Sequence, residues 1–203
     1  MRYWWVNQGQ TYREEREGGY LWSPKRKRGR DGEATVRNPF YEYMRDVAPG
    51  DMVFSYRDGH VVSCGLITSY GYDSPKPSEF GKNGKNWSQF GWRVNVTYFE
   101  ASPFRPKDQL QRISPFLSEE HAPLKADGGG KELYLTKISP EFAGVIIDAL
   151  GAPARACREE GRHLSLHDTT EDFADTLAEQ AGEYLVDRVK QDIQIPETTR
   201  LAI

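Results

Sequence analysis

The side chains of this 203-residue chain that are best suited to chemistry are two tryptophans outside clean strand patterns. Trp22 lies in a short apolar run that Pro24 stops, and Trp87 lies in a polar stretch rich in Gly, Asn and Lys. An indole ring in such a place can stack on a planar base, which contributes roughly 1–3 kcal/mol. The competing interpretation is that both rings belong to the core. We expect that role for Trp4 and Trp92, because they lie within strand patterns.

A basic run follows Trp22 directly. The run and its neighbour at position 37 comprise Lys25, Arg26, Lys27, Arg28, Arg30 and Arg37. Only Asp31 and Glu33 oppose them, although the whole chain has a net charge of −3 and its acidic residues gather toward the C-terminal end. This asymmetry favours a nucleic acid on one side of the molecule, with the basic run contacting phosphates. A solvated loop is the alternative.

Residues for catalysis, metal binding or disulfides are sparse. The four histidines and two cysteines form no nucleophilic triad, and the sequence contains no P-loop and no zinc-ligand spacing. His163 and His167 lie beside Asp168, but further ligands are missing nearby, so a solvated linker is the better interpretation. We therefore expect this chain to be no enzyme and to need neither a metal nor a cofactor.

A β-hairpin is the clearest structural element. Met52, Phe54 and Tyr56 alternate with Val53 and Ser55, which is the pattern of a strand with one buried face. Residues 61–67 are rich in β-branched side chains, and Asp58-Gly59 suits the tight turn between the two strands. Residues 2–8 form a first strand in which Trp4 and Trp5 face opposite ways, so that only one is expected in the core.

The expected positions of the remaining elements follow from helix-capping residues and from the prolines and glycines that interrupt regular structure. Residues 13–19 read as a loop or one helical turn, residues 71–91 as one long loop, and residues 152–167 as a linker. We expect strands over 92–99 and 132–138, and helices from Asn38-Pro39, over 140–150 and over 169–191. Asp73 is either a turn residue of the long loop or a reader of an exocyclic amine.

In their order and spacing, several of these segments together resemble the EVE and YTH branches of the PUA-like superfamily. The resemblance covers residues 1–110 and rests on Tyr3-Trp4-Trp5-Val6, Leu21-Trp22-Ser23, the hairpin strand 53–56, and Asn86-Trp87-Ser88-Gln89. It implies an α+β fold, a small mixed β-barrel that holds one modified nucleobase in an aromatic cage. By this resemblance Trp22 and Trp87 correspond to cage walls, and Asn7, Gln8 and Ser23 are candidate polar readers.

Three functions remain open on these grounds. The first is a reader of 5-methyl- or 5-hydroxymethylcytosine flipped out of double-stranded DNA, and the second is a YTH-like reader of methylated adenine in single-stranded RNA. The third is a structural or protein-interaction domain with all its tryptophans buried. Homodimer formation stays open. No signal segment or long apolar span is visible, so a cytoplasmic protein without a membrane partner is the default expectation.

A second, shorter resemblance concerns the end of the chain. Residues 195–202, after a barrel and a helical connector, look like the junction in modification-dependent HNH restriction endonucleases. That resemblance implies a base-reading domain over 1–138, a helical extension over 139–203, and an HNH nuclease domain in cis beyond them.

Overall fold

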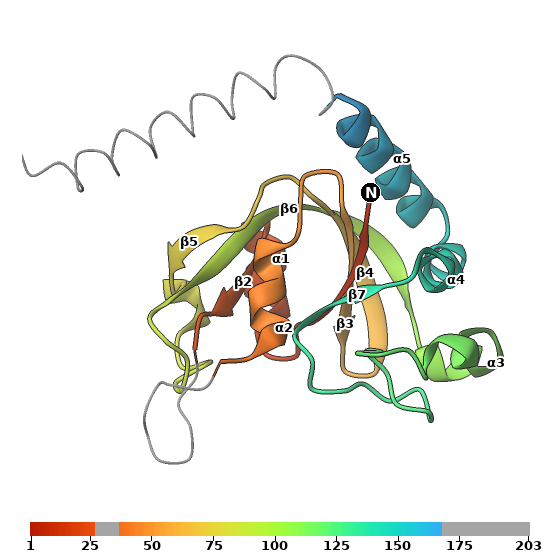
Figure 1. Cartoon of the computed structure of the whole chain (residues 1–203), viewed down its shortest axis with the longest axis horizontal. Coiled ribbons are helices and arrows are strands. Elements are labelled where there is room, and N and C mark those ends of the chain that lie inside the picture. The colour runs from red at the N-terminus through yellow and green to blue at the C-terminus, as the bar shows by residue number, and fades with distance from the viewer. Residues whose placement is uncertain (27–36, 168–203) are drawn as a thin grey trace, which may run out of the picture. The chain divides into compact units, whose positions relative to one another are not determined.

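The computed structural model of the chain describes residues 1–26 and 37–167 (Figure 1). Its strands are β1 (Tyr3–Asn7), β2 (Tyr20–Pro24), β3 (Met52–Arg57), β4 (His60–Ile67), β5 (Tyr72–Pro75), β6 (Phe90–Phe104) and β7 (Leu135–Ile138). Its α-helices are α1 (Tyr12–Gly18), α2 (Pro39–Glu42), α3 (Leu110–Ile113), α4 (Pro140–Leu150) and α5 (Ala152–His167). Short 3₁₀ helices are η1 (Tyr43–Arg45), η2 (Ser78–Phe80), η3 (Pro106–Gln109) and η4 (Ser114–Phe116). The helix predicted over 169–191 and the basic residues Lys27, Arg28 and Arg30 lie outside the described residues.

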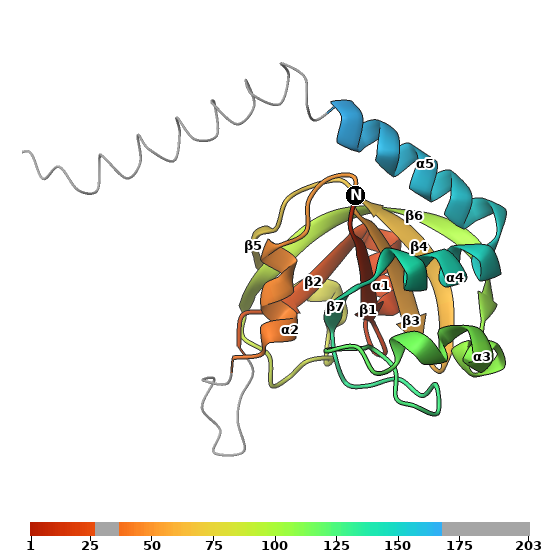
Figure 2. The same ribbon diagram turned by 45° about the vertical axis from the view of Figure 1, so that its right-hand side comes forward.

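The strands form one mixed sheet in the order β2-β6-β4-β3-β1-β7, with β5 paired to β6. β1 and β3 are parallel, and the other pairings of these strands are antiparallel. Register shifts in the β3–β4 and β4–β6 pairings increase the local bend of the sheet. The sheet therefore curls into a small half-barrel with helices around it (Figure 2), which confirms the predicted α+β class.

Several local predictions are confirmed. Asp58 and Gly59 have φ angles of 48° and 82°, the positive values that the tight hairpin turn requires. Asn38 Oδ1 accepts a hydrogen bond of 3.0 Å from the backbone N–H of Phe40 and so caps α2. Helix α4 begins after its N-cap Ser139 and covers residues 140–150, as expected.

The prediction that only one of the paired tryptophans belongs to the core is wrong. Trp4 and Trp5 are 2% and 1% exposed. Trp5 stacks on Phe142 of α4 with ring centroids 6.1 Å apart, while on the opposite face Trp4 packs near Tyr43 of η1 at 6.1 Å. Because β1 lies between β3 and β7 and has helices over both faces (Figures 1 and 2), both side chains are buried.

Two segments expected to be irregular contain regular structure. The long loop over 71–91 includes β5, in which Ser74 pairs with Gly91 of β6. A Cβ at Gly91 would lie 2.1 Å from the backbone oxygen of Ser23, so glycine allows this close approach. Residues 152–167 form helix α5 instead of a linker, because the buried side chains of Ala154 and Cys157 attach it to the core.

Other element boundaries differ from the expected ones. Residues 12–18 form a full helix that Gly19 ends in the left-handed conformation. β6 continues to Phe104, five residues beyond the expected end, and β7 begins only at Leu135. A compact unit covers Met1–Ser165, and the division of the chain at residues 138–139 stays a prediction. None of the helices in the described ranges combines the length and apolar character that crossing a bilayer requires.

Asp51 holds the start of β1 against the turn before β3. Its carboxylate is 3% exposed and accepts hydrogen bonds from the backbone N–H of Arg2 at 2.7 Å, Trp4 Nε1 at 2.9 Å and the backbone N–H of Ala48 at 3.1 Å. The Arg2 guanidinium forms an ion pair with it at 2.9 Å. One side chain therefore satisfies donors from three residues in two segments of the chain.

Replacing Asp51 by alanine is expected to lower the free energy of unfolding by about 3 kcal/mol, because several buried donors lose their acceptor. Urea denaturation measures this loss. The control is Asp148→Ala, since Asp148 is exposed and pairs only across the surface with Arg112. Equal stability of the two variants would contradict this role of Asp51.

Candidate functional site

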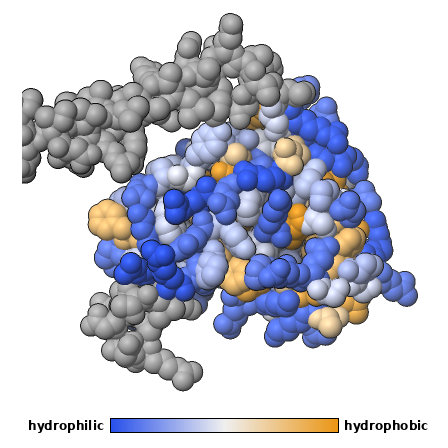
Figure 3. Space-filling model, in the orientation of Figure 1, coloured by the Kyte–Doolittle hydropathy of each residue, from blue (hydrophilic) through white to orange (hydrophobic). Residues whose placement is uncertain are grey.

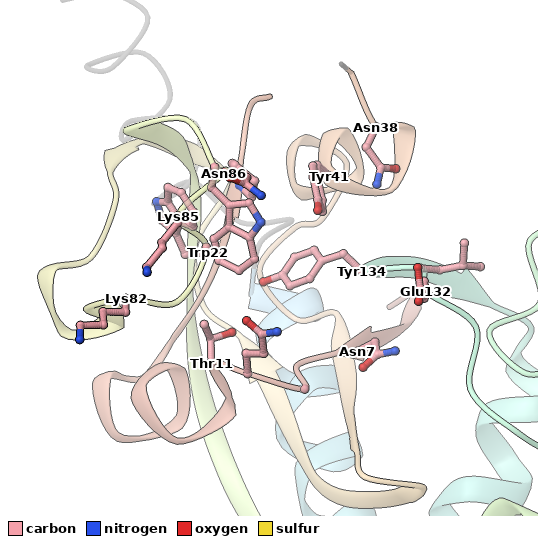
Figure 4. Close-up of a pocket in the computed structure, with 16 residues that line it drawn as sticks. Asn7, Thr11, Trp22, Asn38, Tyr41, Lys82, Lys85, Asn86, Glu132 and Tyr134 are labelled. Atoms are coloured by element: carbon pink, nitrogen blue, oxygen red, sulfur yellow. The ribbon is translucent and has the colours of Figure 1, made fainter. Parts of the chain in front are cut away.

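A pocket of about 530 Å³ lies at one end of the barrel, where β1 and β2 end beside α2 and the loop before β6 (Figure 4). Its described lining combines aromatic, polar and basic side chains. The lining residues are Asn7, Gly9, Gln10, Thr11, Trp22, Pro24, Asn38, Tyr41, Lys82, Gly84, Lys85, Asn86, Trp87, Glu132, Leu133 and Tyr134.

Trp22 and Trp87 form one aromatic wall of this pocket. Their ring centroids are 6.0 Å apart with an interplanar angle of 33°, and Phe80 packs edge-on against Trp22 at 5.7 Å. Trp22 is 0% exposed and its Nε1 donates to the backbone oxygen of Ser74 at 3.4 Å, whereas Trp87 is half-buried. Both tryptophans therefore line one pocket, in which Trp87 shields Trp22.

The two tryptophan rings do not enclose an empty slot. A base stacked between two parallel rings needs about 7 Å between them, that is two contact distances of about 3.5 Å. The centroid separation of 6.0 Å is shorter than that. In this conformation a base cannot lie between these two rings, and the second tryptophan face becomes available only when Trp87 moves.

The loop that carries Trp87 has an unusual backbone. Gly81 and Gly84 have φ angles of 52° and 62°, which favour glycine. A Cβ at Gly84 would lie 2.1 Å from the Trp87 ring. Lys76 Nζ donates to the backbone oxygen of Gly84 at 3.2 Å, and Asn83 Nδ2 donates to the backbone oxygen of Gln10 at 3.0 Å. The two glycines therefore let the indole ring fold back onto its own loop.

Opposite the tryptophans, the pocket wall is polar and connects to a buried acid. Figure 4 shows the hydroxyl groups of Thr11 and Tyr134 directed toward the centre of the site. Thr11 Oγ1 donates to Glu15 Oε1 at 2.9 Å, and Tyr134 Oη donates to the same oxygen at 3.5 Å. Gln8 Nε2 donates to Glu15 Oε2 and approaches Tyr98 Oη at 3.2 Å.

Glu15 itself is fully buried behind the pocket. Burial raises the pKa of its carboxyl from 4.5 to about 8, although hydrogen bonds from Gln8, Thr11, the Trp22 backbone and Tyr134 lower it. A carboxyl with this pKa is mainly protonated at neutral pH. The polar wall of the pocket is therefore hydrogen-bonded to a carboxyl group that is largely uncharged at neutral pH.

The sequence-predicted polar readers lie in different places. Asn7 lines the pocket, and its Nδ2 donates to the backbone oxygen of Lys131 at 3.0 Å. The described lining does not include Gln8, Ser23 or Asp73. Gln8 lies behind it with Glu15, and buried Ser23 donates to the backbone oxygen of Tyr41 at 3.1 Å.

The sequence left two roles open for Asp73, a turn residue or a base reader in the pocket, and the structure places it in neither a turn nor the pocket lining. It is exposed on β5, and its carboxylate forms an ion pair of 2.6 Å with Lys25 Nζ. The same Nζ lies 5.6 Å from the centre of the Trp92 ring. A carboxylate engaged in this way on the strand does not reach the pocket lining. Of the basic run, Lys25 and Arg26 are described, and the lysines at the pocket are instead Lys82 and Lys85.

Sequence reasoning missed most of the polar half of the site. Tyr41 and Tyr134 contact each other edge-on, with centroids 5.8 Å apart, although they are far apart in the chain. Glu15 lies in the segment 13–19, which reads as a loop or one helical turn, and Thr11 lies just before that segment. The only local signal was the i, i+4 spacing of Thr11 and Glu15 at the start of a helix.

The metal-ligating side chains of residues 1–26 and 37–167 do not gather into a metal site. No group of three His, Cys, Asp or Glu side chains there could hold a metal ion. Cys64 and Cys157 are both buried free thiols, and contact with Cys64 together with burial raises the pKa of the Cys157 thiol. Both cysteines belong to the core of the domain.

Neither a protein-family model nor a curated protein sequence matches the chain, but solved structures do. The Pho92 YTH domain, solved in complex with m6A, has a TM-score of 0.51 at 9% identity over 74% of this chain and 86% of its own. A Rhodopseudomonas palustris protein solved by NMR has a TM-score of 0.45 at 16% identity over 74% and 94%. Human THYN1, solved with DNA containing 5-methylcytosine, has a TM-score of 0.41 at 12% identity over 75% and 99%.

The similarity to the YTH domain identifies the fold. The chain shares the fold of that YTH domain, in agreement with the α+β fold that the resemblance in its sequence implies. At such low identity the likeness concerns the path of the backbone and not the ligand.

Proposed function

We propose that the pocket binds a single modified nucleobase, and that this base is 5-methyl- or 5-hydroxymethylcytosine flipped out of double-stranded DNA. The observation that carries the proposal is the composition of the pocket. An aromatic wall of Trp22 and Trp87 faces the hydroxyl groups of Thr11 and Tyr134 within about 530 Å³. A planar ligand with a polar edge matches both walls.

The energies are compatible with a flipped base. Extruding a base from a duplex costs a few kcal/mol, and stacking on one aromatic side chain contributes roughly 1–3 kcal/mol. One tryptophan face alone does not offset that cost. Hydrogen bonds from the polar wall, or a second face uncovered by movement of Trp87, must supply the rest.

The fold supports the same proposal by analogy. The YTH domain that shares it was solved in complex with m6A. That complex also favours the second candidate function, a reader of methylated adenine in single-stranded RNA. The two candidates differ in substrate, since the first acts on a duplex and the second needs an unpaired base.

A binding panel tests the proposal. It compares duplexes that carry cytosine, 5-methylcytosine, 5-hydroxymethylcytosine or N6-methyladenine at one position, alongside single-stranded RNA with adenine or N6-methyladenine. Tighter binding of a duplex with modified cytosine supports the first function, and preference for methylated RNA supports the second. Equal affinity for every modified and unmodified partner would leave the protein-interaction domain as the better account.

The lysines at the pocket are proposed to contact phosphates next to the bound base. Lys82 and Lys85 are exposed lining residues. Replacing both by alanine is expected to reduce the slope of log affinity against log salt by about 2, and to weaken modified and unmodified partners alike.

The control for this pair is Lys107→Ala, because Lys107 pairs with Asp127 and does not line the pocket. An unchanged salt slope in the double variant would show that these lysines are only solvated. The same measurement on variants of Lys25, Arg26, Lys27, Arg28 and Arg30 tests the phosphate contacts predicted for the basic run.

We also propose, from the resemblance of the chain's end, that the domain delivers an HNH nuclease domain in cis to modified DNA. In this proposal the chain recognises and the attached domain cuts. The present chain alone then binds modified DNA and leaves it intact.

A further inference from the structure

The buried acid behind the pocket controls the direction of two hydroxyl groups. Glu15 Oε1 accepts from Thr11 Oγ1 at 2.9 Å and from Tyr134 Oη at 3.5 Å, and both donors line the pocket. Glu15 is 0% exposed and does not line the pocket itself. Its influence on a ligand therefore passes through the two hydroxyls.

Hydrogen-bond counting determines what these hydroxyls offer a ligand. Each hydroxyl carries one hydrogen and two lone pairs. When the hydrogens of Thr11 and Tyr134 point at Glu15 Oε1, only lone pairs remain for the pocket. This part of the wall then accepts hydrogen bonds and does not donate them.

The same direction holds in both charge states of the acid. An ionised Glu15 accepts at both oxygens. In the protonated acid, Oε1 already receives two donors, so the proton belongs on Oε2, beside the amide of Gln8. Gln8 Oε1 is buried without a hydrogen-bond partner among the described residues, and a turn of that amide lets it accept this proton. In either state the two hydroxyls keep their hydrogens toward Glu15.

We propose that Glu15 is a positioning residue that makes the pocket select a base with an exocyclic amino group over one with a carbonyl at the same place. This inference rests on the proposed function, since it concerns the edge of the bound base. An amino group donates to the lone pairs of Thr11 and Tyr134, whereas a carbonyl oxygen meets them with lone pairs of its own. Cytosine and adenine derivatives then fit, and thymine or uracil does not.

Matched bases test this selection. 5-Methylcytosine and thymine share the methyl group and differ at the amino or carbonyl edge, and each is placed opposite an abasic site so that neither must break a base pair. For single-stranded RNA, N6-methyladenine is compared with 6-methoxypurine, in which oxygen replaces the N–H group. Wild-type protein is expected to prefer the amino member of the bound pair by about 10- to 100-fold.

Glu15→Leu is the decisive variant. Leucine removes the acceptor of both hydroxyls, so each can turn its hydrogen into the pocket, and the preference is expected to fall about 10-fold, with tighter binding of the carbonyl base. Thr11→Val is the second variant: it removes one acceptor, and it is expected to weaken the amino base alone. Thr97→Val, at an exposed position on β6, is the matched control and keeps the full preference.

The outcomes separate the two claims. If neither pair binds better than unmodified cytosine or adenine, the proposed function fails and this inference fails with it. If modified bases bind but wild type does not prefer the amino member, the inference alone is overturned. The same holds if Glu15→Leu and Thr11→Val both keep the wild-type preference while circular dichroism shows them folded.

Discussion

Replacing Trp87 by alanine is expected to weaken binding of the modified base by about 5- to 150-fold, the equivalent of roughly 1–3 kcal/mol of stacking. Trp87 is the half-buried member of the aromatic wall and lies in a loop, so the ligand can reach its ring. Because its ring is only partly covered, the domain is expected to stay folded. Equilibrium binding and thermal denaturation of the same variant measure the two effects.

Trp22→Ala is expected to behave differently. The Trp22 ring is 0% exposed and packs against both Phe80 and Trp87, so its removal leaves a cavity and costs about 3–5 kcal/mol of stability. The sequence resemblance implies a cage wall at Trp22, whereas the structure places its ring in a buried cluster with Tyr20 and Phe80. Loss of base binding in this variant therefore does not by itself indicate contact with the base.

Trp92→Ala is the matched control for Trp87. Trp92 is also half-buried, but it packs beside the barrel core and does not line the pocket. It is expected to lose some stability and to keep the preference for a modified base. Equal loss of that preference in the Trp87 and Trp92 variants would contradict the assignment of the pocket.

Stability is expected to fall as the pH rises from about 5 to 8, because of Glu15. The pKa of its carboxyl is about 8 in the folded protein against 4.5 as the ordinary value. Between these two pH values the unfolded chain releases the proton and the folded chain retains it. The unfolded state thus binds fewer protons, and each pH unit lowers the free energy of unfolding by about 1.4 kcal/mol.

Glu15→Gln isolates this effect, because glutamine does not ionise. The stability of the variant relative to wild type is expected to rise with pH across that range and to level off above about pH 8. Glu17→Gln, at an exposed position of the same helix, is the control and should follow wild type. A difference between Glu15→Gln and wild type that does not change with pH would show that the acid ionises normally in the fold.

Local features of the fold were predictable because their causes are local. The Asp58-Gly59 turn and the Asn38 cap depend on a few neighbouring residues. The burial of both Trp4 and Trp5 was not predictable in this way, since it requires layers on both faces of β1. Helix α5 carried a readable signal, the small buried residues Ala154, Cys157 and Gly161 at helical spacing, which its many charges obscured.

The candidate site likewise contains a part that was predictable from sequence and a part that was not. Trp87 could be singled out because it stands in a polar segment where burial had little local support, whereas Trp22, in an apolar run, was singled out through the family resemblance. The polar wall could not, because its central contact joins Tyr134 to Glu15 across 119 positions of sequence. A charged residue in a short helix gives no sign that the sheet will close over it. Ser23 and Asp73 were predicted as possible base readers but do not line the pocket. Ser23 instead hydrogen-bonds the backbone of Tyr41, and Asp73 pairs with the side chain of Lys25.

The most direct test of the central claim is an NMR titration that follows the indole N–H signals of the five tryptophans. Tryptophan-to-phenylalanine variants assign the signals, and a 5-methylcytosine duplex and an N6-methyladenine RNA are each titrated beside their unmodified counterparts. The predicted result is a shift of the Trp87 signal, with Trp22 following, that only a modified partner produces, while Trp5 in the core stays unchanged. Tight binding of a modified partner that leaves the Trp22 and Trp87 signals in place would contradict a base-binding role of this pocket.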